Sequence, residues 1–171
     1  MTRVQQTGIP ALIKHKNVVL KSETGSGKTL TYLVPLIEQL SRYSLEVERI
    51  TRDNGTYAVI FSPTRELCVQ IDVEINKLLK LFYYLNTGAI MGGENPKKEK
   101  AKLRKGLTIV IATPGRLLYH LKNTESMKFS RLQTIIIDEA DRMLDMGFEK
   151  EMTACMDEIK KRCEGTSKFT E

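Results

Sequence analysis

Short runs of β-branched and aliphatic residues alternate with longer amphipathic stretches along the chain. The short runs are nearly continuous in Val, Ile and Leu, which is typical of strands buried on both faces of a parallel sheet. We therefore predict strands over residues 17–21, 57–61, 85–91, 107–111 and 134–138.

Helices are predicted between these runs, where apolar residues recur at three- and four-residue spacing. The helical stretches cover residues 28–41, 65–82, 96–105 and 148–162. Residues 42–56 are polar and contain Asn54-Gly55, so they predict a surface loop or insertion. Because strands and helices alternate, we expect βαβ units in a three-layer α/β domain, with a mostly parallel sheet flanked by helices.

Length and composition narrow the class of protein. A chain of 171 residues fits one domain. No apolar run approaches the roughly 20 residues that span a bilayer, and the first ten residues lack the apolar core of a secretion signal. Three cysteines without metal-ligand spacing favour a reduced, intracellular compartment. His120 is isolated in the sequence and is expected to be a surface or packing residue.

Positive charge is concentrated in one short segment. Residues 97–105 (KKEKAKLRK) hold six basic residues and one acidic residue, which accounts for most of the net charge of +6. Such a block attracts polyanions, including nucleic acid. A solvated helix face would look the same, so the charge pattern leaves both interpretations open.

A glycine-rich loop follows the first predicted strand and runs directly into a predicted helix that starts at Lys28. Strand, glycine-rich loop, Lys-Thr and helix are arranged as in a phosphate-binding P-loop. Gly25 and Gly27 allow the backbone amides to converge on phosphate oxygens, Lys28 can reach the outer phosphates, and the Thr29 hydroxyl can hold Mg²⁺. The candidate phosphate-binding residues are Ser22, Glu23, Thr24, Gly25, Ser26, Gly27, Lys28 and Thr29. Ser22 occupies the usual first glycine position, so a plain Gly/Ser turn is the alternative.

Two carboxylates follow the last predicted strand. Open α/β sheets bind ligands at the carboxyl ends of their strands, where Asp138 and Glu139 are expected to lie. Asp138 could hold the Mg²⁺ of a nucleotide, and Glu139 could act as general base toward a water near the terminal phosphate. An acidic turn that caps the next helix is the alternative.

Taken together, these motifs resemble the first RecA-like domain of a DEAD-box RNA helicase. Asp138-Glu139-Ala140-Asp141 spells the family name, and the glycine-rich loop is similar to its motif I. Four further blocks match in order: Thr2-Arg3-Val4-Gln5 (Q motif), Pro63-Thr64-Arg65-Glu66-Leu67 (Ia), Gly92-Gly93 (GG) and Thr113-Pro114-Gly115-Arg116 (Ib). The resemblance covers essentially the whole chain.

The resemblance implies ATP and Mg²⁺ as cofactors and RNA as partner. Gln5 would recognise adenine, Lys28 and Thr29 would bind phosphates and Mg²⁺, Asp138 would hold Mg²⁺, and Glu139 would orient and deprotonate the attacking water. The residues implied to contact RNA are Pro63, Thr64, Arg65, Gly92, Gly93, Thr113, Pro114, Gly115 and Arg116. The full-length protein would hydrolyse ATP to unwind RNA duplexes locally, as a monomer.

Residues 1–171 would then be the N-terminal RecA-like ATP-binding domain of a longer helicase. The Ser-Ala-Thr motif, the second RecA-like domain and its arginine finger are not within this sequence. We therefore expect the isolated domain to bind ATP or ADP weakly and to be nearly inactive. Two alternatives stay open: another superfamily 2 ATPase, such as a DNA-directed helicase, and a non-catalytic RNA-binding adaptor with a relic nucleotide site.

A finer resemblance concerns the segment around the GG motif. Gly92-Gly93-Glu94-Asn95, followed by the basic block, resembles the DEAD-box subgroup linked to nucleolar assembly of the large ribosomal subunit. This resemblance implies ribosome biogenesis and a location in the nucleus or nucleolus.

Overall fold

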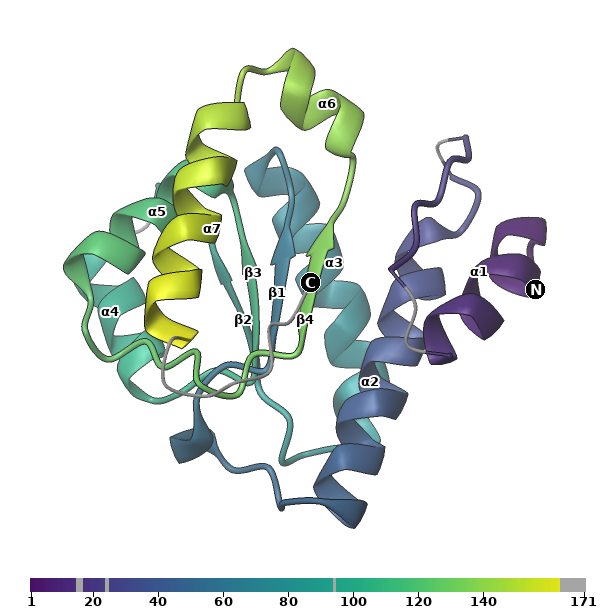
Figure 1. Ribbon diagram of the computed structural model, residues 1–171, viewed down its shortest axis with the longest axis horizontal. Helices are drawn as coiled ribbons and strands as arrows, with labels where there is room; N and C mark the ends of the chain where they lie inside the picture. Colours follow the sequence, from purple (N-terminus) through teal and green to yellow (C-terminus); the bar gives the residue numbers. More distant parts are fainter. Residues whose placement is uncertain (15–16, 24, 94, 164–171) are drawn as a thin grey trace.

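The computed structural model describes residues 1–14, 17–23, 25–93 and 95–163. In this part of the chain, four parallel strands form one sheet in the order β2-β3-β1-β4 (Figure 1). The strands are β1 (Ala58–Phe61), β2 (Thr87–Ile90), β3 (Ile109–Ala112) and β4 (Thr134–Ile137). Four of the five predicted strands are therefore confirmed.

Helices cover both faces of the sheet, which confirms the three-layer α/β architecture (Figure 1). One face carries α2 (Lys28–Glu46), α3 (Arg65–Leu78) and the 3₁₀ turn η2 (Leu79–Leu81). The other face carries α4 (Pro96–Arg104), α5 (Pro114–Asn123) and α7 (Glu149–Cys163). The remaining elements are α1 (Arg3–Ile13), η1 (Arg52–Asn54) and α6 (Ala140–Asp145).

The two central strands are buried on both faces, as their sequences predict. Along β1, Ala58 and Ile60 pack into the core shared with α2 and α3, while Val59 and Phe61 pack into the core shared with α5 and α7. All four side chains are fully inaccessible to solvent. Every residue of β1 must therefore be apolar, which explains why its sequence does not alternate between apolar and polar positions.

The prediction of a strand over residues 17–21 is wrong. These residues have no partner in the sheet, and Val19 is 98% exposed. A strand exists only where a neighbour completes its ladder of hydrogen bonds. In the described part of the chain, β4 pairs with β1 on one side only, so it is an edge strand and its last residue, Ile137, is 44% exposed.

Helix boundaries differ from the prediction at the ends of two helices. α2 continues to Glu46, five residues past the predicted end, so the predicted loop at 42–56 begins later. Tyr43 holds this extra turn against the core, because its ring packs edge-to-face on that of Tyr57 at 5.6 Å. The predicted helix 65–82 ends at Leu78 and continues as the turn η2.

None of the helices that the structure describes is long and apolar enough to cross a membrane.

Candidate nucleotide site and nucleic-acid interface

All four strands are parallel, so their carboxyl ends meet at one edge of the sheet. The predicted motifs follow these strand ends. Along the edge, in the order of the strands, come the GG element after β2, residues 113–116 after β3, residues 63–67 after β1 and residues 138–141 after β4. The fold thus places the implied RNA contacts side by side, with the acidic segment next to them.

The glycine-rich loop has the backbone geometry expected of a phosphate-binding loop. Gly25 and Gly27 have φ of 77° and 93°, in the left-handed region that favours glycine. Lys28 begins α2, and its Nζ donates to the carbonyls of Ser22 at 2.6 Å and Glu23 at 3.2 Å. The loop therefore curls around the lysine ammonium although no strand precedes it. Thr24 lies outside the described residues.

Gln5 lies directly against this loop. Thr2 caps α1, and the Gln5 Oε1 accepts from the Thr2 backbone N–H at 2.9 Å. The Gln5 Nε2 donates to the Gly27 carbonyl at 3.4 Å. A Cβ on Gly27 would lie only 2.6 Å from that nitrogen. The dihedral angle favours glycine here, and an added Cβ would also displace the end of the Gln5 side chain. An amide has two hydrogens and two lone pairs, so Gln5 keeps capacity for a ligand.

Asp138 meets the helix that carries Lys28. The Tyr32 hydroxyl, one turn after Lys28, donates to Asp138 Oδ2 at 3.0 Å. Burial raises the pKa of Asp138 above its ordinary value, and the Tyr32 hydrogen bond and the Lys28 charge oppose that rise in part. The charge of Lys28 in the phosphate-binding loop therefore acts on Asp138 in the acidic segment. Tyr32 was not predicted as a site residue from the sequence. Its hydroxyl lies four residues after Lys28 on an otherwise apolar helix face, and this could have indicated a polar partner nearby.

Glu139 has a strained backbone. Its φ of 49° and ψ of 51° are left-handed, and no other non-glycine residue in the described part of the chain has positive φ. Such a conformation costs roughly 1–2 kcal/mol and is common at functional sites. Its N–H donates to Asp138 Oδ1 at 3.1 Å, and its carboxylate accepts from Arg142 at 3.1 Å. The adjacent carboxylates of Asp138 and Glu139 therefore have different hydrogen-bond partners and point in different directions.

The donor atoms at this site suit Mg²⁺. The Asp138 carboxylate and the Thr29 hydroxyl are hard oxygen donors, and both interact with Tyr32. Within the described ranges, no three or more His, Cys, Asp or Glu side chains gather as a metal cage. Mg²⁺ commonly binds one or two carboxylates and takes its other ligands from phosphates and water. The residues present therefore fit a metal that arrives with a nucleotide.

The implied RNA contacts converge around the GG element. Gly92 and Gly93 have φ of 74° and 80°. A Cβ on Gly93 would overlap the Arg65 guanidinium, and one on Gly92 would lie 3.7 Å from both Arg65 Nη2 and Arg116 Cδ. Residues of the GG element and of the first turns of α3 and α5 thus form one surface, with backbone amides and guanidinium groups that suit phosphate oxygens.

Two helix N-termini face the same edge. Thr64 caps α3 and accepts from the Leu67 N–H at 3.3 Å, while Thr113 precedes α5. The partial positive charge of these helix ends favours anions. Pro63 and Pro114 are buried, which leaves them to shape the turns, whereas Gly115 is exposed with no atom within 4 Å of an added Cβ.

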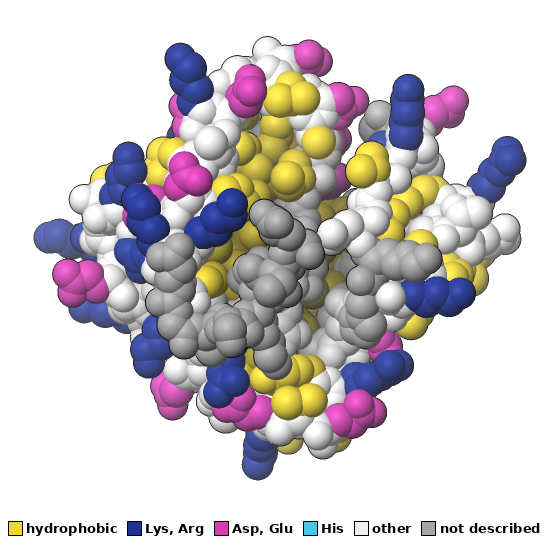
Figure 2. All heavy atoms as spheres, in the orientation of Figure 1, with side chains coloured by type: hydrophobic (Ala, Val, Ile, Leu, Met, Phe, Trp, Pro, Cys, Tyr) yellow, Lys and Arg dark blue, Asp and Glu magenta, His cyan; other side chains and the backbone are white. Residues whose placement is uncertain are grey.

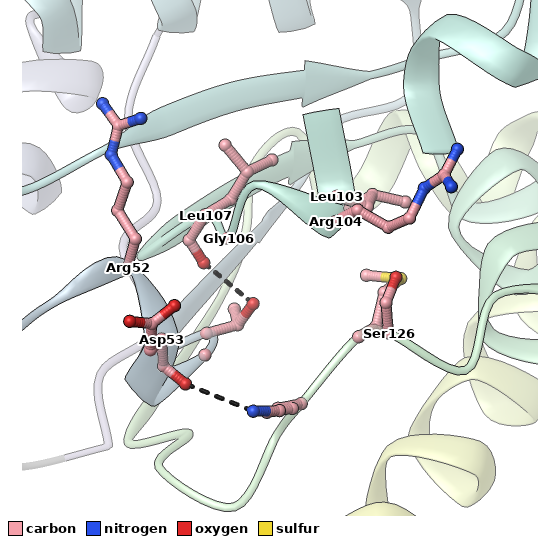
Figure 3. Close-up of a pocket in the computed structure, with 11 residues that line it drawn as sticks. Arg52, Asp53, Leu103, Arg104, Gly106, Leu107 and Ser126 are labelled. Atoms are coloured by element: carbon pink, nitrogen blue, oxygen red, sulfur yellow. Dashed lines mark hydrogen bonds between the residues drawn. The ribbon is translucent and has the colours of Figure 1, made fainter. Parts of the chain in front are cut away.

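A small pocket lies at the opposite end of the sheet, before β1 and β3 (Figure 3). It encloses about 60 Å³, enough for a few water molecules only. Figure 3 shows Arg52 and Arg104 on opposite sides of it, so their charges do not converge. Thr56 Oγ1 donates to the Leu107 carbonyl at 3.0 Å across the pocket. We interpret this pocket as a junction between loops and not as the nucleotide site.

Comparison with known proteins agrees with the geometry. The sequence matches the DEAD/DEAH box helicase family over residues 2–170. A protein named ATP-dependent DNA helicase DDX31 from Dictyostelium discoideum is 48% identical over 170 residues, which cover 98% of this chain and 18% of the relative. A protein named ATP-dependent RNA helicase dbp7 from Aspergillus niger is 42% identical over 168 residues, which cover 94% and 22%.

The fold also matches a solved structure, that of the yeast DEAD-box splicing factor Prp28. The TM-score is 0.82 at 31% identity, over 95% of this chain and 37% of the other. The chain spans about a fifth of the length of the curated relatives it matches. Since the family match extends over nearly every residue and the predicted motifs meet at one edge of a sheet with the same fold, this chain belongs to the DEAD/DEAH box helicase family.

Proposed function

We propose that this chain is the first, ATP-binding RecA-like domain of a helicase that couples ATP hydrolysis to local separation of RNA strands. The observation that carries the proposal is the Tyr32 hydrogen bond to Asp138, because it links the helix of the phosphate-binding lysine to the acidic segment. The partner domain is a second RecA-like domain in the same protein, which acts as a monomer.

In this proposal the loop amides and Lys28 hold the phosphates of ATP, and the Gln5 amide recognises the adenine edge. Thr29 and Asp138 would hold Mg²⁺, which when bound neutralises charge on the phosphate oxygens. Glu139 orients the attacking water and accepts its proton. The proximity of Gln5 to Gly27 supports the assignment, because the amide proposed to recognise adenine contacts the proposed phosphate-binding loop.

RNA is held through its phosphates, without recognition of sequence. The Gly93 amide, the helix ends after Thr64 and Thr113, and the Arg65 guanidinium supply the donors, next to Gly92, whose own N–H donates to Glu99. Lys and Arg side chains also gather on the side of α4 (Figure 2). They are consistent with an additional, less specific attraction for the polyanion.

The nucleotide assignment is tested by Lys28→Ala. We expect ADP affinity, measured by calorimetric titration, to fall by at least about a hundredfold while the circular dichroism spectrum stays the same, because the ammonium is the main charge opposite the phosphates. Lys122→Ala removes an exposed lysine near the end of α5 and is the matched control. Unchanged ADP binding in Lys28→Ala would refute the P-loop assignment.

The relatives favour a direct comparison of RNA with DNA, because one is named an RNA helicase and the other a DNA helicase. Binding through phosphates alone tolerates both, and only contacts to the ribose 2′-hydroxyl separate them. Competition between single-stranded RNA and DNA of equal sequence measures the preference. Because the motifs resemble those of RNA helicases, we expect RNA to bind more tightly than DNA. A clear preference for DNA would favour the DNA-directed alternative.

The non-catalytic alternative predicts a different result from the full-length protein. Lys28, Thr29, Asp138 and Glu139 are all present in a chain that also keeps the strained Glu139 backbone. An ATPase assay of the full-length protein with and without RNA should show stimulated turnover. An adaptor with a relic nucleotide site would bind RNA but would not turn over ATP.

We also propose a role in assembly of the large ribosomal subunit, with the protein in the nucleolus. The resemblance of residues 92–106 to that DEAD-box subgroup supports it. Fluorescence imaging of the tagged full-length protein, with sedimentation of cell extracts, tests the proposal. A protein that stays outside the nucleolus and separates from ribosomal precursors would contradict it.

A further inference from the structure

One carboxylate of the basic helix α4 points into the protein. Glu99 is the single acidic residue of that helix, and it is fully buried, whereas Lys97, Lys98 and Lys102 are exposed. An acid in this position does not serve the solubility or the positive field of the helix. Its contacts instead lie at the amino-terminal end of the helix, toward the GG element and α5.

The Glu99 carboxylate accepts hydrogen bonds from three residues in two elements, the GG element and α5. Oε1 accepts from the Gly92 backbone N–H at 3.2 Å. Oε2 accepts from Arg116 at 2.6 Å and lies 3.0 Å from His120 Nε2. The GG element after β2 and the Arg116 side chain after β3 are therefore joined through one buried group.

A second layer of contacts holds these partners in place. The His120 ring is fully buried, and its Nδ1 lies 3.0 Å from the Thr124 hydroxyl. Since the ionised carboxylate accepts only, Nε2 carries the hydrogen, and Nδ1 accepts from Thr124 when the ring is neutral. The Arg116 guanidinium also lies over the Tyr119 ring, 4.7 Å from its centroid. Each group around Glu99 thus has one preferred orientation.

Ionisation of Glu99 is favoured despite its burial. Burial alone would raise its pKa, but hydrogen bonds from His120, Arg116 and the Gly92 amide outweigh that effect and lower the pKa below the ordinary glutamate value. The negative charge is therefore present at neutral pH next to a surface that should attract phosphates. A negative charge beside a surface proposed to bind RNA would weaken that binding, so its contacts indicate another function of Glu99.

We propose that Glu99 is a positioning residue of the RNA-facing surface, whose carboxylate anchors the GG element through the Gly92 N–H and holds the Arg116 side chain, so that the neighbouring donors keep the geometry that receives a phosphate. The inference rests on the proposed RNA binding. It extends that function to Glu99, a buried residue that does not contact RNA itself. It also explains why the basic helix α4 contains an acidic residue.

Glu99→Gln tests the proposal because it preserves shape while replacing one acceptor oxygen with a donor that faces other donors. We expect the affinity for a short fluorescein-labelled oligouridine to fall about tenfold, as expected for loss of one well-placed ionic contact. The slope of log affinity against log salt should also decrease by about 0.7, the value for one phosphate contact to a single strand. ADP affinity should not change, because β1 separates this network from the acidic segment.

The sign of the effect discriminates between explanations. If Glu99 acted only through its charge, its neutralisation would strengthen binding to RNA. Tighter or unchanged RNA binding by Glu99→Gln therefore overturns the proposal. Glu125→Gln, which neutralises an exposed carboxylate just after α5, is the control and should bind RNA as the parent chain does.

A loss of ADP affinity in Glu99→Gln would indicate general misfolding. His120→Gln then becomes the test, since it keeps the Glu99 charge and can still donate one hydrogen bond. There we expect about threefold weaker RNA binding with unchanged ADP affinity, and unchanged RNA binding would refute the positioning role. If the parent chain itself failed to bind RNA, the proposed function would fall, and the two failures are distinguishable because one appears in the parent and the other only in the variant.

Discussion

The Tyr32 hydroxyl connects the two halves of the nucleotide site through a single hydrogen bond to Asp138. The two residues are 106 positions apart in the sequence. Asp138 would otherwise be a partly buried carboxylate beside the Glu139 charge, and both conditions raise its pKa. The Tyr32 hydrogen bond lowers the pKa of Asp138 and so favours its carboxylate form.

Tyr32→Phe should make nucleotide binding more sensitive to acid. Burial already raises the pKa of Asp138, and loss of the hydroxyl removes a hydrogen bond that lowers it, so the pKa rises further. Because Mg²⁺ binds the carboxylate and not the protonated acid, affinity for Mg·ADP should decline at a higher pH than in the parent. At pH 6 we expect affinity to be about fivefold weaker, as for one lost hydrogen bond.

Calorimetric titrations from pH 5 to 8, with the parent measured in the same buffers, check this expectation. The difference between the two curves matters, since the nucleotide itself titrates. Stability moves in the opposite direction. The folded-state pKa of Asp138 is raised, so its ionisation costs stability at neutral pH and protonation relieves that cost as the pH falls through the folded value. Identical pH profiles for both proteins would mean that Tyr32 does not control Asp138.

Some functional residues could be predicted from the sequence and others could not. Lys28 and Asp138 were predictable because phosphate and metal chemistry demands those residue types directly after a glycine loop or a strand. Glu99 and His120 have roles that depend on contacts between α4 and α5, which local sequence does not encode. His120 was expected to be a surface or packing residue, and it is indeed buried, but its hydrogen bonds on both ring nitrogens were not predicted.

At the scale of elements, α1 is held against α2 by a close glycine contact. A Cβ on Gly8 would lie 2.5 Å from Thr31 Cγ2 and 3.2 Å from Leu20 Cδ2. α1 also carries Gln5, which contacts the phosphate-binding loop. The distance between the two helices therefore controls the position of a residue in the nucleotide site.

Gly8→Ala should weaken nucleotide binding without touching the nucleotide. The added methyl group forces α1 away from α2 and displaces Gln5, and overpacking of this kind costs about 1–3 kcal/mol. We expect ADP affinity to fall by about threefold to tenfold, measured by fluorescence titration. Thr31→Ser in the same background removes the clashing methyl and keeps the hydroxyl that donates to Gly27 at 2.9 Å, so it should restore affinity. Failure of this rescue would contradict the explanation.

Arg162 joins α7 to the end of α5. Its guanidinium donates to the carbonyls of Thr124 at 3.2 Å and Met127 at 3.0 Å, and also to that of Leu121. These acceptors lie at or just after the carboxyl end of α5, where positive charge is favourable. A single side chain therefore satisfies several carbonyls and secures the packing of two helices.

Arg162→Ala should lower the free energy of unfolding by about 1–3 kcal/mol, since carbonyls lose their donors. Arg162→Lys should recover only part of that loss, because an ammonium cannot reproduce the planar set of guanidinium donors. Urea denaturation followed by circular dichroism measures both. Equal stability of the parent and the alanine variant would show that water replaces the guanidinium without cost.

Periodicity predicted the four strands of the sheet and the helices α2, α3, α4 and α7, but it did not predict α5, although Leu117 and Leu121 of that helix are buried. β1 and β3 were evident because both faces are covered. Residues 17–21 also contain an apolar run, Val18 to Leu20, but they have no strand partner and therefore form no strand. α1 was not predicted, because Gly8 and Pro10 interrupt its pattern, and its capping by Thr2 and Gln5 became clear only in the fold.

At the scale of the whole molecule, the sheet order places the two proposed binding surfaces along one edge, with β1 between them. Hydrophobic side chains remain exposed nearby, among them Ile137, Leu144 and Met146 (Figure 2). In the proposed helicase, a second RecA-like domain completes the catalytic charges around ATP. Under this proposal, residues 1–171 alone would offer only part of the site.

We expect the 171-residue chain alone to bind ADP weakly and to hydrolyse ATP at least about a hundredfold more slowly than the full-length protein with RNA, since a missing arginine finger alone costs 10³–10⁵ in related phosphoryl transfer. A coupled phosphate-release assay compares the two. Rapid, RNA-stimulated turnover by the short chain would contradict the proposed division of labour between domains.

The three-layer fold was predictable because alternating strand and helix patterns permit few other arrangements. The order of the strands was not, because the patterns do not specify which strands are neighbours. That order decides which motifs are adjacent. The convergence of Arg65 on Gly93, from segments almost thirty positions apart in the sequence, therefore depended on the three-dimensional structure.

The three cysteines are built-in chemical probes of local unfolding in this protein. Cys68 is buried in the layer with α2 and α3, while Cys155 and Cys163 are buried in the layer with α5 and α7. All three are free thiols that form no disulfide. Burial raises the pKa of Cys68 and of Cys155 to about 12, so alkylating reagents should react only when a layer separates from the sheet. The order in which mass spectrometry detects these adducts would show which layer loosens first, and whether nucleotide or RNA slows either one.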